Sequence, residues 1–283
     1  MQDEVTGAPR SAALHALQAM QAIVVRELLK FARQYGRLVS ALVRPVLWLA
    51  VFAAGFRNVF GVAIVEPYDT YIPYDVYIAP GLVGMVLLFN GMQSSLAMVY
   101  DREMGLMRLL LTAPLPRAWI LLSKLVATAV LSLAQAAAFV VVAALLGTPL
   151  PLWGPQAAAV LAAVVGAALM LGALGLALSV HIRQLENFAG TMNFVIFPMY
   201  FMSTALYPLW KLEESGADWV YQWARFNPFT HAVEWMRFAT YGKDAGASPW
   251  IVLGTLALCF AVACWGYDPQ RGFGALSKRG GAA

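Results

Sequence analysis

The feature that most constrains this chain is a long segment without a charged side chain. No Asp, Glu, Lys or Arg occurs between Lys124 and Arg183. A helix needs about 20 consecutive apolar residues to cross a bilayer, so this segment is long enough for two crossings and a short turn. Of the 283 residues, 61% are hydrophobic and 12% are charged, which is about half the charged fraction of soluble domains. We therefore predict an integral membrane protein.

Hydropathy along the rest of the chain predicts four further spans, and hence an all-α membrane protein with six transmembrane helices. The expected order is a disordered tail over 1–10, a cytoplasmic interfacial helix over 11–37, the membrane domain over 38–267 and a cytoplasmic tail over 268–283. The six predicted spans cover 38–58, 77–99, 118–146, 157–180, 188–210 and 248–267.

The 11–37 helix has apolar residues every three or four positions and basic residues on the opposite face. A soluble amphipathic helix shows the same pattern. Because this one runs directly into a span, we expect it to lie on the anionic inner leaflet, with membrane lipids as partners.

Two local patterns predict details of packing. The small residues Ala168, Gly172, Gly175 and Ser179 share one side of the fourth span, which allows close approach of another helix. Residues 211–247 mix aromatic and charged side chains, as expected at a membrane surface, and we predict two short helices at the outer interface. The pair Asn227-Pro228 predicts a helix start, since Asn caps a helix and Pro suits its first position.

The distribution of basic residues predicts the orientation. With the N-terminus inside, the inner segments hold 14 of the Lys and Arg residues and the outer segments hold 5. An excess of Lys and Arg marks the cytoplasmic side, so both termini and residues 101–124 are expected there and residues 211–247 outside. The net charge of +4 follows from this topology and does not indicate nucleic-acid binding.

Residues 101–124, DREMGLMRLLLTAPLPRAWILLSK, form the one well-charged segment between Asp75 and Arg183. They open as a short amphipathic helix, which Pro114 and Pro116 end because proline lacks an amide donor. A soluble partner could push on the membrane part through such a helix. A solvated helix that only joins two spans has the same spacing, so the spacing leaves both interpretations open.

The motifs that carry enzymatic chemistry are absent. The sequence has no GxxxxGK[ST] phosphate loop, no HExxH and no GxSxG, so we expect no nucleotide hydrolysis by that route, no metal site and no cofactor in this chain. Ionisable residues are scarce inside the predicted spans, which argues against ion-coupled transport. Movement of a large amphipathic substrate with energy supplied from elsewhere is compatible with this composition.

Four segments, in order, resemble the permease subunit of the type-2 ABC exporter family, which includes bacterial drug, lipid and polysaccharide exporters. They are RPVLWLAVFAAGF (44–56), APGLVGM (79–85), YDREMGLMRLLLTAPLPRAWILLSKLVA (100–127) and NPFTHAVEWMRFATYG (227–242). The third resembles the family signature most closely.

The resemblance implies a multi-pass protein of the bacterial inner membrane with both termini cytoplasmic. It implies a homodimer that encloses the pathway and a separate ABC ATP-binding subunit that binds ATP and Mg²⁺. The helix over 101–113 would be the coupling helix, with ATPase-coupling residues Asp101, Arg102, Glu103, Gly105, Arg108, Thr112 and Pro114. The substrate path would be lined by Asn90, Asn193, Phe197, Tyr200 and Met202, although plain helix packing also accounts for the aromatic and Met residues.

The implied function is export of a hydrophobic or amphipathic substrate by a transporter subunit that is not itself an enzyme. Three alternatives stay open. The first is export of a lipid-linked polysaccharide by the same mechanism. The second is an integral membrane lipid-modifying enzyme, for which His231, Glu234 and Arg237 form the nearest polar group. The third is a membrane anchor without transport.

Overall fold

The computed structural model describes residues 12–33, 35–56, 61–62, 67–69, 72–104, 116–147, 154–182 and 184–267. Within these ranges the structure is α-helical apart from one short antiparallel pair of strands, β1 (Gly61–Val62) and β2 (Ile72–Pro73). The helices are α1 (Ala12–Ala32), α2 (Tyr35–Phe56), α3 (Tyr74–Glu103), α5 (Arg117–Leu145), α6 (Ala157–His181), α7 (Leu185–Phe201), α8 (Leu209–Glu214), α9 (Asp218–Phe226), α10 (Pro228–Thr240) and α11 (Ser248–Gly266).

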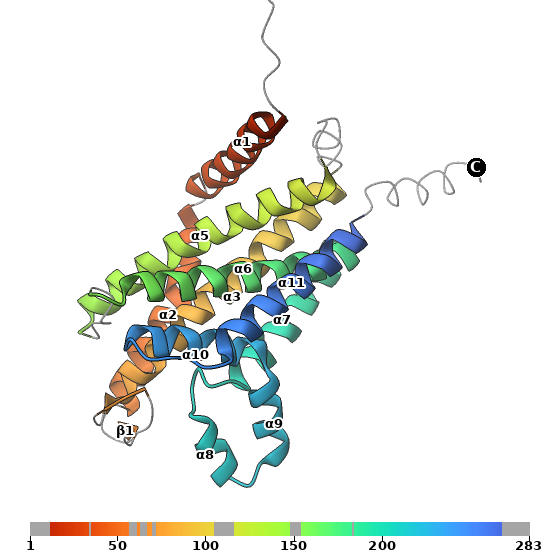
Figure 1. Cartoon of the computed structure of the whole chain (residues 1–283). Helices are drawn as coiled ribbons and strands as arrows, with labels where there is room; N and C mark the ends of the chain where they lie inside the picture. Colours follow the sequence, from red (N-terminus) through yellow and green to blue (C-terminus); the bar gives the residue numbers. More distant parts are fainter. Residues whose placement is uncertain are drawn as a thin grey trace, which may run out of the picture.

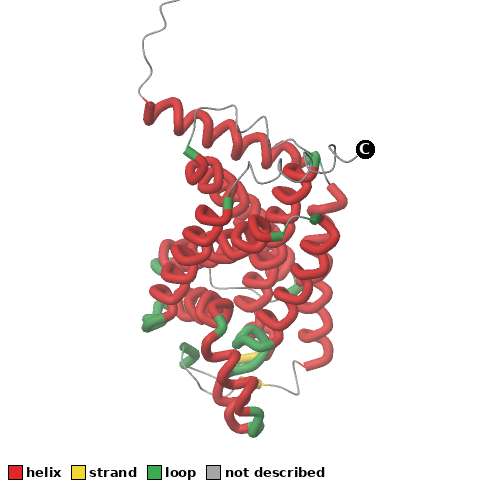
Figure 2. The backbone as a smooth tube through the Cα atoms, turned by 90° about the vertical axis from the view of Figure 1, so that its right-hand side faces the viewer, coloured by secondary structure: helices red, strands yellow, loops and turns green. Residues whose placement is uncertain are grey.

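The long helices form one bundle with different elements at its two ends (Figure 1). The start of α1 and the end of α11 lie at one end. Helices α8, α9 and α10 and the β1–β2 pair lie at the other, where α8 and α9 project beyond the bundle. Figure 2 shows the same order from the side, with α1 across one end. We call the first the α1 end and the second the α10 end.

Helix α3 occupies the centre of the bundle and contacts α2, α5, α6, α7 and α10. Nearly all of its side chains from Tyr74 to Met92 are buried, as expected of a helix that is apolar on every side. Its glycines let neighbours approach. A methyl group on Gly91 would meet the Leu171 carbonyl oxygen of α6 at 3.0 Å, and one on Gly175 of α6 would meet the Gly91 carbonyl oxygen at 2.8 Å. The predicted close packing of the small residues in the fourth span is therefore confirmed at Gly172 and Gly175.

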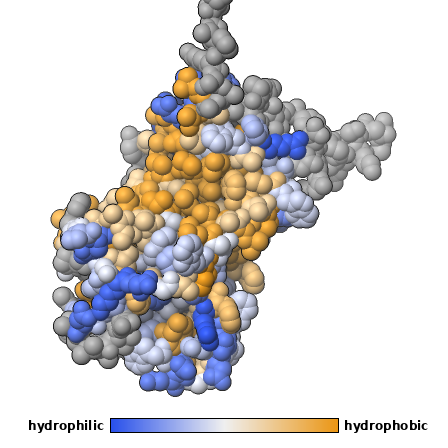
Figure 3. Space-filling view, in the orientation of Figure 1, coloured by the Kyte–Doolittle hydropathy of each residue, from blue (hydrophilic) through white to orange (hydrophobic). Residues whose placement is uncertain are grey.

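Within the described ranges, four helices are long and apolar enough to cross a membrane: α3, α5, α6 and α11. Helix α2 is 22 residues long with an apolar stretch over Leu42–Val51, and α7 is 17 residues long. On the face in Figure 3, apolar residues cover the middle of the bundle and polar residues gather toward the α10 end. The chain is an all-α, multi-span protein.

Three boundaries differ from those predicted. The N-terminal helix ends at Ala32, and α2 already begins at Tyr35. Helix α3 continues through Glu103, so Asp101, Arg102 and Glu103 form its last turn and do not open a new helix. The fifth predicted span is shorter than expected, because α7 ends at Phe201 soon after Pro198.

Hydrogen bonds from Asn227 at the α10 end explain why α7 ends early. The Nδ2 atom of Asn227 donates to the carbonyl oxygens of Met199 at 2.7 Å and Met202 at 2.8 Å. In a continuing helix, the Met199 oxygen would accept from the amide four residues later. The Oδ1 atom of Asn227 also accepts from the Phe229 amide, so the predicted helix start at Asn227-Pro228 is confirmed. Residues 211–247 contain α9, α10 and most of α8, one helix more than predicted.

Candidate functional site

The last turn of α3 carries a buried carboxylate. Asp101 is 4% exposed, and its Oδ2 atom lies 3.4 Å from Nζ of Lys124 on α5. Its Oδ1 atom lies 3.5 Å from Nζ of Lys30 on α1. Because Lys124 is also buried, each charge depends on its partner for stabilisation in place of water. One carboxylate therefore joins α1, α3 and α5 at the α1 end.

Helix α1 is held against α5 by a second polar contact. The indole Nε1 atom of Trp119 donates to the Ala16 carbonyl oxygen at 2.9 Å. A cavity of about 250 Å³ lies beside the Asp101 ion pair, between α1, α3 and α5. The opposite side of α1 carries exposed Leu14, Leu17, Val25 and Leu29. The helix thus has one face packed on the bundle and an opposite face with exposed apolar side chains, and its interfacial location stays a prediction.

Arg102, the next residue along α3, reaches the end of α6. Its Nη2 atom donates to the carbonyl oxygens of Ser179 at 2.7 Å and Ile182 at 2.5 Å. Its Nη1 atom donates to the carbonyl oxygen of Val180 at 3.3 Å. The last carbonyl groups of a helix lack partners within the helix and carry partial negative charge, so a guanidinium is well suited to this position.

The predicted ATPase-coupling residues lie in different environments. Asp101 and Arg102 make the contacts just described within the bundle. Glu103 is exposed at the α1 end. Gly105, Arg108, Thr112 and Pro114 lie outside the described residues. Direct contact of any of these side chains with an ATPase stays a prediction.

Asn90, predicted to line a substrate path, belongs to a polar network between α3 and α5. Its Nδ2 atom donates to Oγ of Ser132 at 2.7 Å and to the Thr128 carbonyl oxygen at 3.3 Å. Its Oδ1 atom accepts from Nε2 of Gln135 at 3.1 Å. Asn90 is 2% exposed. Within one copy of the chain it therefore serves as an interhelical hydrogen-bonding group.

The other predicted path residues lie on or after α7 and separate into two environments. Asn193 and Phe197 are exposed. Tyr200 is buried and packs edge-on against Trp48 of α2. Met202 is partly buried, and its carbonyl oxygen accepts from Asn227. The outward face of α7 also carries Phe194, 80% exposed, and Phe201.

At the α10 end, a buried arginine joins α10 to α3. The Nη1 atom of Arg237 donates to Glu234, and Nη2 donates to the Thr204 carbonyl oxygen at 2.8 Å. The guanidinium lies 4.1 Å from the centre of the Tyr77 ring. Nearby, burial raises the pKa of the Tyr68 phenol, which therefore stays neutral. These contacts hold α10, α3 and residues 202–208 together.

His231 does not complete a catalytic group with these residues. Its Nε2 atom lies 3.1 Å from the Arg225 carbonyl oxygen and its Nδ1 atom 3.2 Å from Oγ of Ser248. Burial lowers the pKa of its imidazole, which favours the neutral ring. A carbonyl can only accept, so Nε2 carries the proton and Nδ1 accepts from Ser248. Both ring nitrogens are engaged, which disfavours a general-base role.

Sequence reasoning did not identify Lys30 and Lys124 as partners of Asp101, nor Ser132 and Gln135 as partners of Asn90. A usable signal was present for two of them. Lys124 lies seven residues inside α5, and Gln135 lies within a charge-free span. Polar side chains at such depth generally need a partner on a neighbouring helix.

Comparison with known proteins adds an independent finding. The sequence model of ABC-2 type transporters matches residues 18–241 of the chain. A protein of Porphyra purpurea named "Putative transport permease ycf38" is 30% identical over 241 residues, which cover 83% of this chain and 78% of that protein. Proteins with the same name from Pyropia yezoensis and Cyanophora paradoxa are 30% identical over 227 residues and 28% identical over 228 residues. Each covers 78% of this chain and 74% of its own length.

Proposed function

The chain belongs to the ABC-2 type transporter family, and from this premise we propose that it is the membrane-spanning permease subunit of an ATP-driven exporter. The observation that carries the proposal is the family match over 18–241, which runs from α1 through α10. The family and the names of the relatives indicate a transport permease and not an enzyme.

The energy source in this proposal is a separate ABC ATP-binding subunit. No GxxxxGK[ST] phosphate loop occurs in the chain, so ATP and Mg²⁺ would be bound by the partner. The partner would dock at the α1 end, where Glu103 is exposed. Glu103 belongs to the sequence segment 101–124, which resembles the family signature. Support for this side comes from the excess of Lys and Arg in the segments that would face the cytoplasm.

The proposed topology has six spans, with α2 and α7 added to the four helices that meet the length and hydropathy requirement. An even number of crossings places both termini on one side. The described ends of the chain, at the start of α1 and the end of α11, lie at the same end of the bundle (Figure 1). We assign that side to the cytoplasm and the membrane to the bacterial inner membrane.

The substrate path is proposed to run between two copies of the chain, along the outward face of α2 and α7. On α2, Val39, Val43, Leu47 and Val51 recur every four residues and all are exposed. Trp48 of α2 packs edge-on against Phe201 of α7, with ring centres 5.8 Å apart. Helices α2 and α7 therefore meet at this contact, and we propose that their exposed apolar faces, which on α7 include Phe194 and Phe197, form one surface. Such a surface suits a hydrophobic or amphipathic substrate.

A second candidate substrate class is a lipid-linked polysaccharide, and a specific observation favours it. Trp219 and Trp223 lie one helical turn apart on α9 and are 66% and 65% exposed. Two exposed indoles at the proposed outer exit could stack on sugar rings. Replacement of both by Ala would reduce transport of a glycolipid and leave transport of an amphipathic dye unchanged. The reverse result would exclude this substrate class.

Complex formation tests the proposal before any substrate is known. We expect a tagged chain, solubilised in mild detergent, to co-purify with an ABC ATP-binding subunit in equal amount and to alter its ATPase rate. Purification of a stable chain that turns over a lipid without any nucleotide-binding partner would overturn the proposal.

A further inference from the structure

Arg102 forms a bridge between the cytoplasmic end of α3 and the end of α6. Its guanidinium donates to three carbonyl oxygens, those of Ser179, Val180 and Ile182. A planar fork with several donors can satisfy these acceptors together, whereas a lysine ammonium acts from a single point. The contact joins a side chain at the last turn of α3 to the backbone of α6, so a shift of one helix end acts directly on the other.

Helix α6 is built to carry such a shift along its length. It has 25 residues without an internal proline, whereas α2, α3 and α7 each contain one. At 1.5 Å per residue it extends about 37 Å, enough to cross the membrane. Sharp kinks occur mainly at proline, at Gly/Ser pairs and where hydrogen bonding is interrupted. Because α6 has no proline, we expect it to move as one piece.

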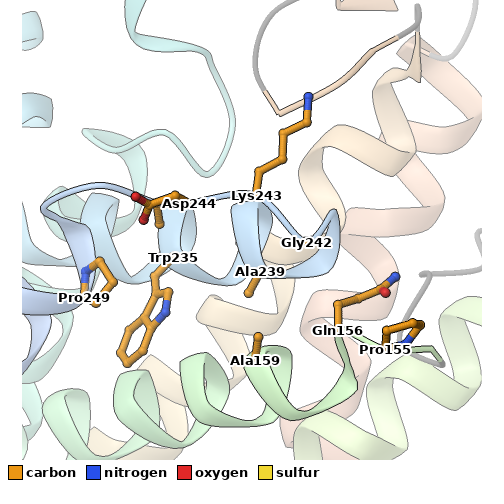
Figure 4. A pocket seen from close by; sticks show the side chains of 10 residues that line it. Pro155, Gln156, Ala159, Trp235, Ala239, Gly242, Lys243, Asp244 and Pro249 are labelled. Atoms are coloured by element: carbon orange, nitrogen blue, oxygen red, sulfur yellow. The ribbon is translucent and has the colours of Figure 1, made fainter.

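The far end of α6 rests on α10. A methyl group added to Gly166 would lie 2.4 Å from the Trp235 ring, and Figure 4 shows Trp235 pointing from α10 onto α6 beside a cavity of about 500 Å³. The Nε2 atom of Gln156 also donates to the Thr240 carbonyl oxygen at 3.5 Å. Helix α10 in turn holds the end of α7 through Asn227. Direct contacts thus connect Arg102 with the end of α7.

We propose that Arg102 is the positioning residue that couples the cytoplasmic end of α3 to α6, so that a displacement there reaches α10 and the end of α7. The inference rests on the proposed function, because the ATPase supplies the displacement. Asp101 has a different role. It fixes the same turn of α3 to α1 and α5, while Arg102 links it to α6.

The test uses the complex with its ATPase in proteoliposomes and compares Arg102→Gln, Arg102→Lys and the control Arg33→Gln. Arg33 is exposed just after α1, so the control removes the same charge on the same side. Substrate moved per ATP hydrolysed should fall about tenfold in Arg102→Gln, within the range expected when a connecting residue is lost. ATPase activity should persist, Arg102→Lys should lie between, and the control should match the wild type.

A second readout needs no transported substrate. Hydrogen exchange of the α10 amides is measured with and without a non-hydrolysable ATP analogue. We expect the analogue to change this exchange in the wild type but not in Arg102→Gln. An unchanged ratio of transport to hydrolysis in Arg102→Gln, or a nucleotide response in α10 that persists in it, would overturn the inference. Failure of the proposed function appears separately, as an absence of ATP-driven transport in the wild type, whereas failure of the inference alone leaves the wild type active and Arg102→Gln equally well coupled.

Discussion

Asp101 and Lys124 form an ion pair in which 5% of one side chain and 8% of the other is exposed, with Oδ2 and Nζ 3.4 Å apart. Lys30 places a second ammonium 3.5 Å from the same carboxylate and is 39% exposed. One carboxylate therefore lies between two ammonium groups, one buried and one near the surface, and Oε1 of Glu27 lies 3.6 Å from the ammonium of Lys30. For that reason, we expect removal of Asp101 and removal of Lys124 to lower the stability of the protein by different amounts.

Asp101→Asn should destabilise the protein more than Lys124→Met. The Asn variant leaves Lys124 buried without its carboxylate, and breaking a buried pair in this way costs about 3–5 kcal/mol. The Met variant leaves Asp101 paired with Lys30, so its cost is smaller. Thermal unfolding of the detergent-solubilised protein measures both. The double variant should be more stable than Asp101→Asn alone, and a strictly additive loss would contradict the pairing.

Asn227→Asp should be at least as destabilising as Asn227→Ala. At an ordinary helix start, Asp and Asn cap equally well, and loss of the cap costs about 1 kcal/mol. Here the amide also donates to the carbonyl oxygens of Met199 in α7 and of Met202 just after it, and a carboxylate would place an acceptor against acceptors. Unfolding temperatures of the two variants decide the matter. An Asp variant as stable as the wild type would show that the contacts with Met199 and Met202 are unimportant.

Gly175→Ala should lower stability, and Gly254→Ala should not. Ala normally favours a helix over Gly by about 1 kcal/mol. A methyl group on Gly175 would lie 2.5 Å from Oγ of Ser95 and 2.8 Å from the Gly91 carbonyl oxygen. A methyl group on Gly254 would have no neighbouring atom within 4 Å. Overpacking costs about 1–3 kcal/mol, so the two changes should have opposite signs in thermal unfolding. Equal effects would mean that α3 and α6 are not in close contact.

Asn90→Ala should lower the stability of the protein, whereas Phe197→Ala should change transport and leave stability nearly unchanged. The first leaves the buried Ser132 and Gln135 without a partner, at a cost of about 1–2 kcal/mol. The second removes a ring that is 48% exposed, so unfolding should change little while the selectivity of transport changes. Paired unfolding and transport assays test both expectations. A selectivity change in Asn90→Ala without loss of stability would place Asn90 in the path after all.

The sequence was sufficient to predict the features that depend on local pattern. Hydropathy located α3, α5, α6 and α11 as spans, since each needs only its own apolar length. The start of α10 followed from the capping preference of Asn and the fixed backbone of Pro. Small residues in α6 indicated close packing before the partner helix was known.

The features that depend on distant residues could not be predicted from pattern. Helix α7 ends at Phe201 because the Asn227 side chain donates hydrogen bonds to the carbonyl oxygens of Met199 and Met202. Asn227 is 25 residues beyond Met202. The hydrogen bonds of Arg102 to the end of α6 connect residues 77 to 80 positions apart. Neither contact can be predicted from the hydropathy of the neighbouring residues. The resemblance of residues 100–127 to the family signature therefore indicated a function for Asp101 and Arg102 but not their contacts.

We propose that this chain moves a substrate only when a separate ATPase drives it. The most direct measurement is uptake of an amphipathic fluorescent substrate into inside-out proteoliposomes that contain the chain with its co-purifying ATP-binding subunit. We expect uptake with ATP and Mg²⁺, and none with a non-hydrolysable analogue or with the chain alone. Uptake that is independent of ATP, or that the chain supports without the ATP-binding subunit, would contradict it.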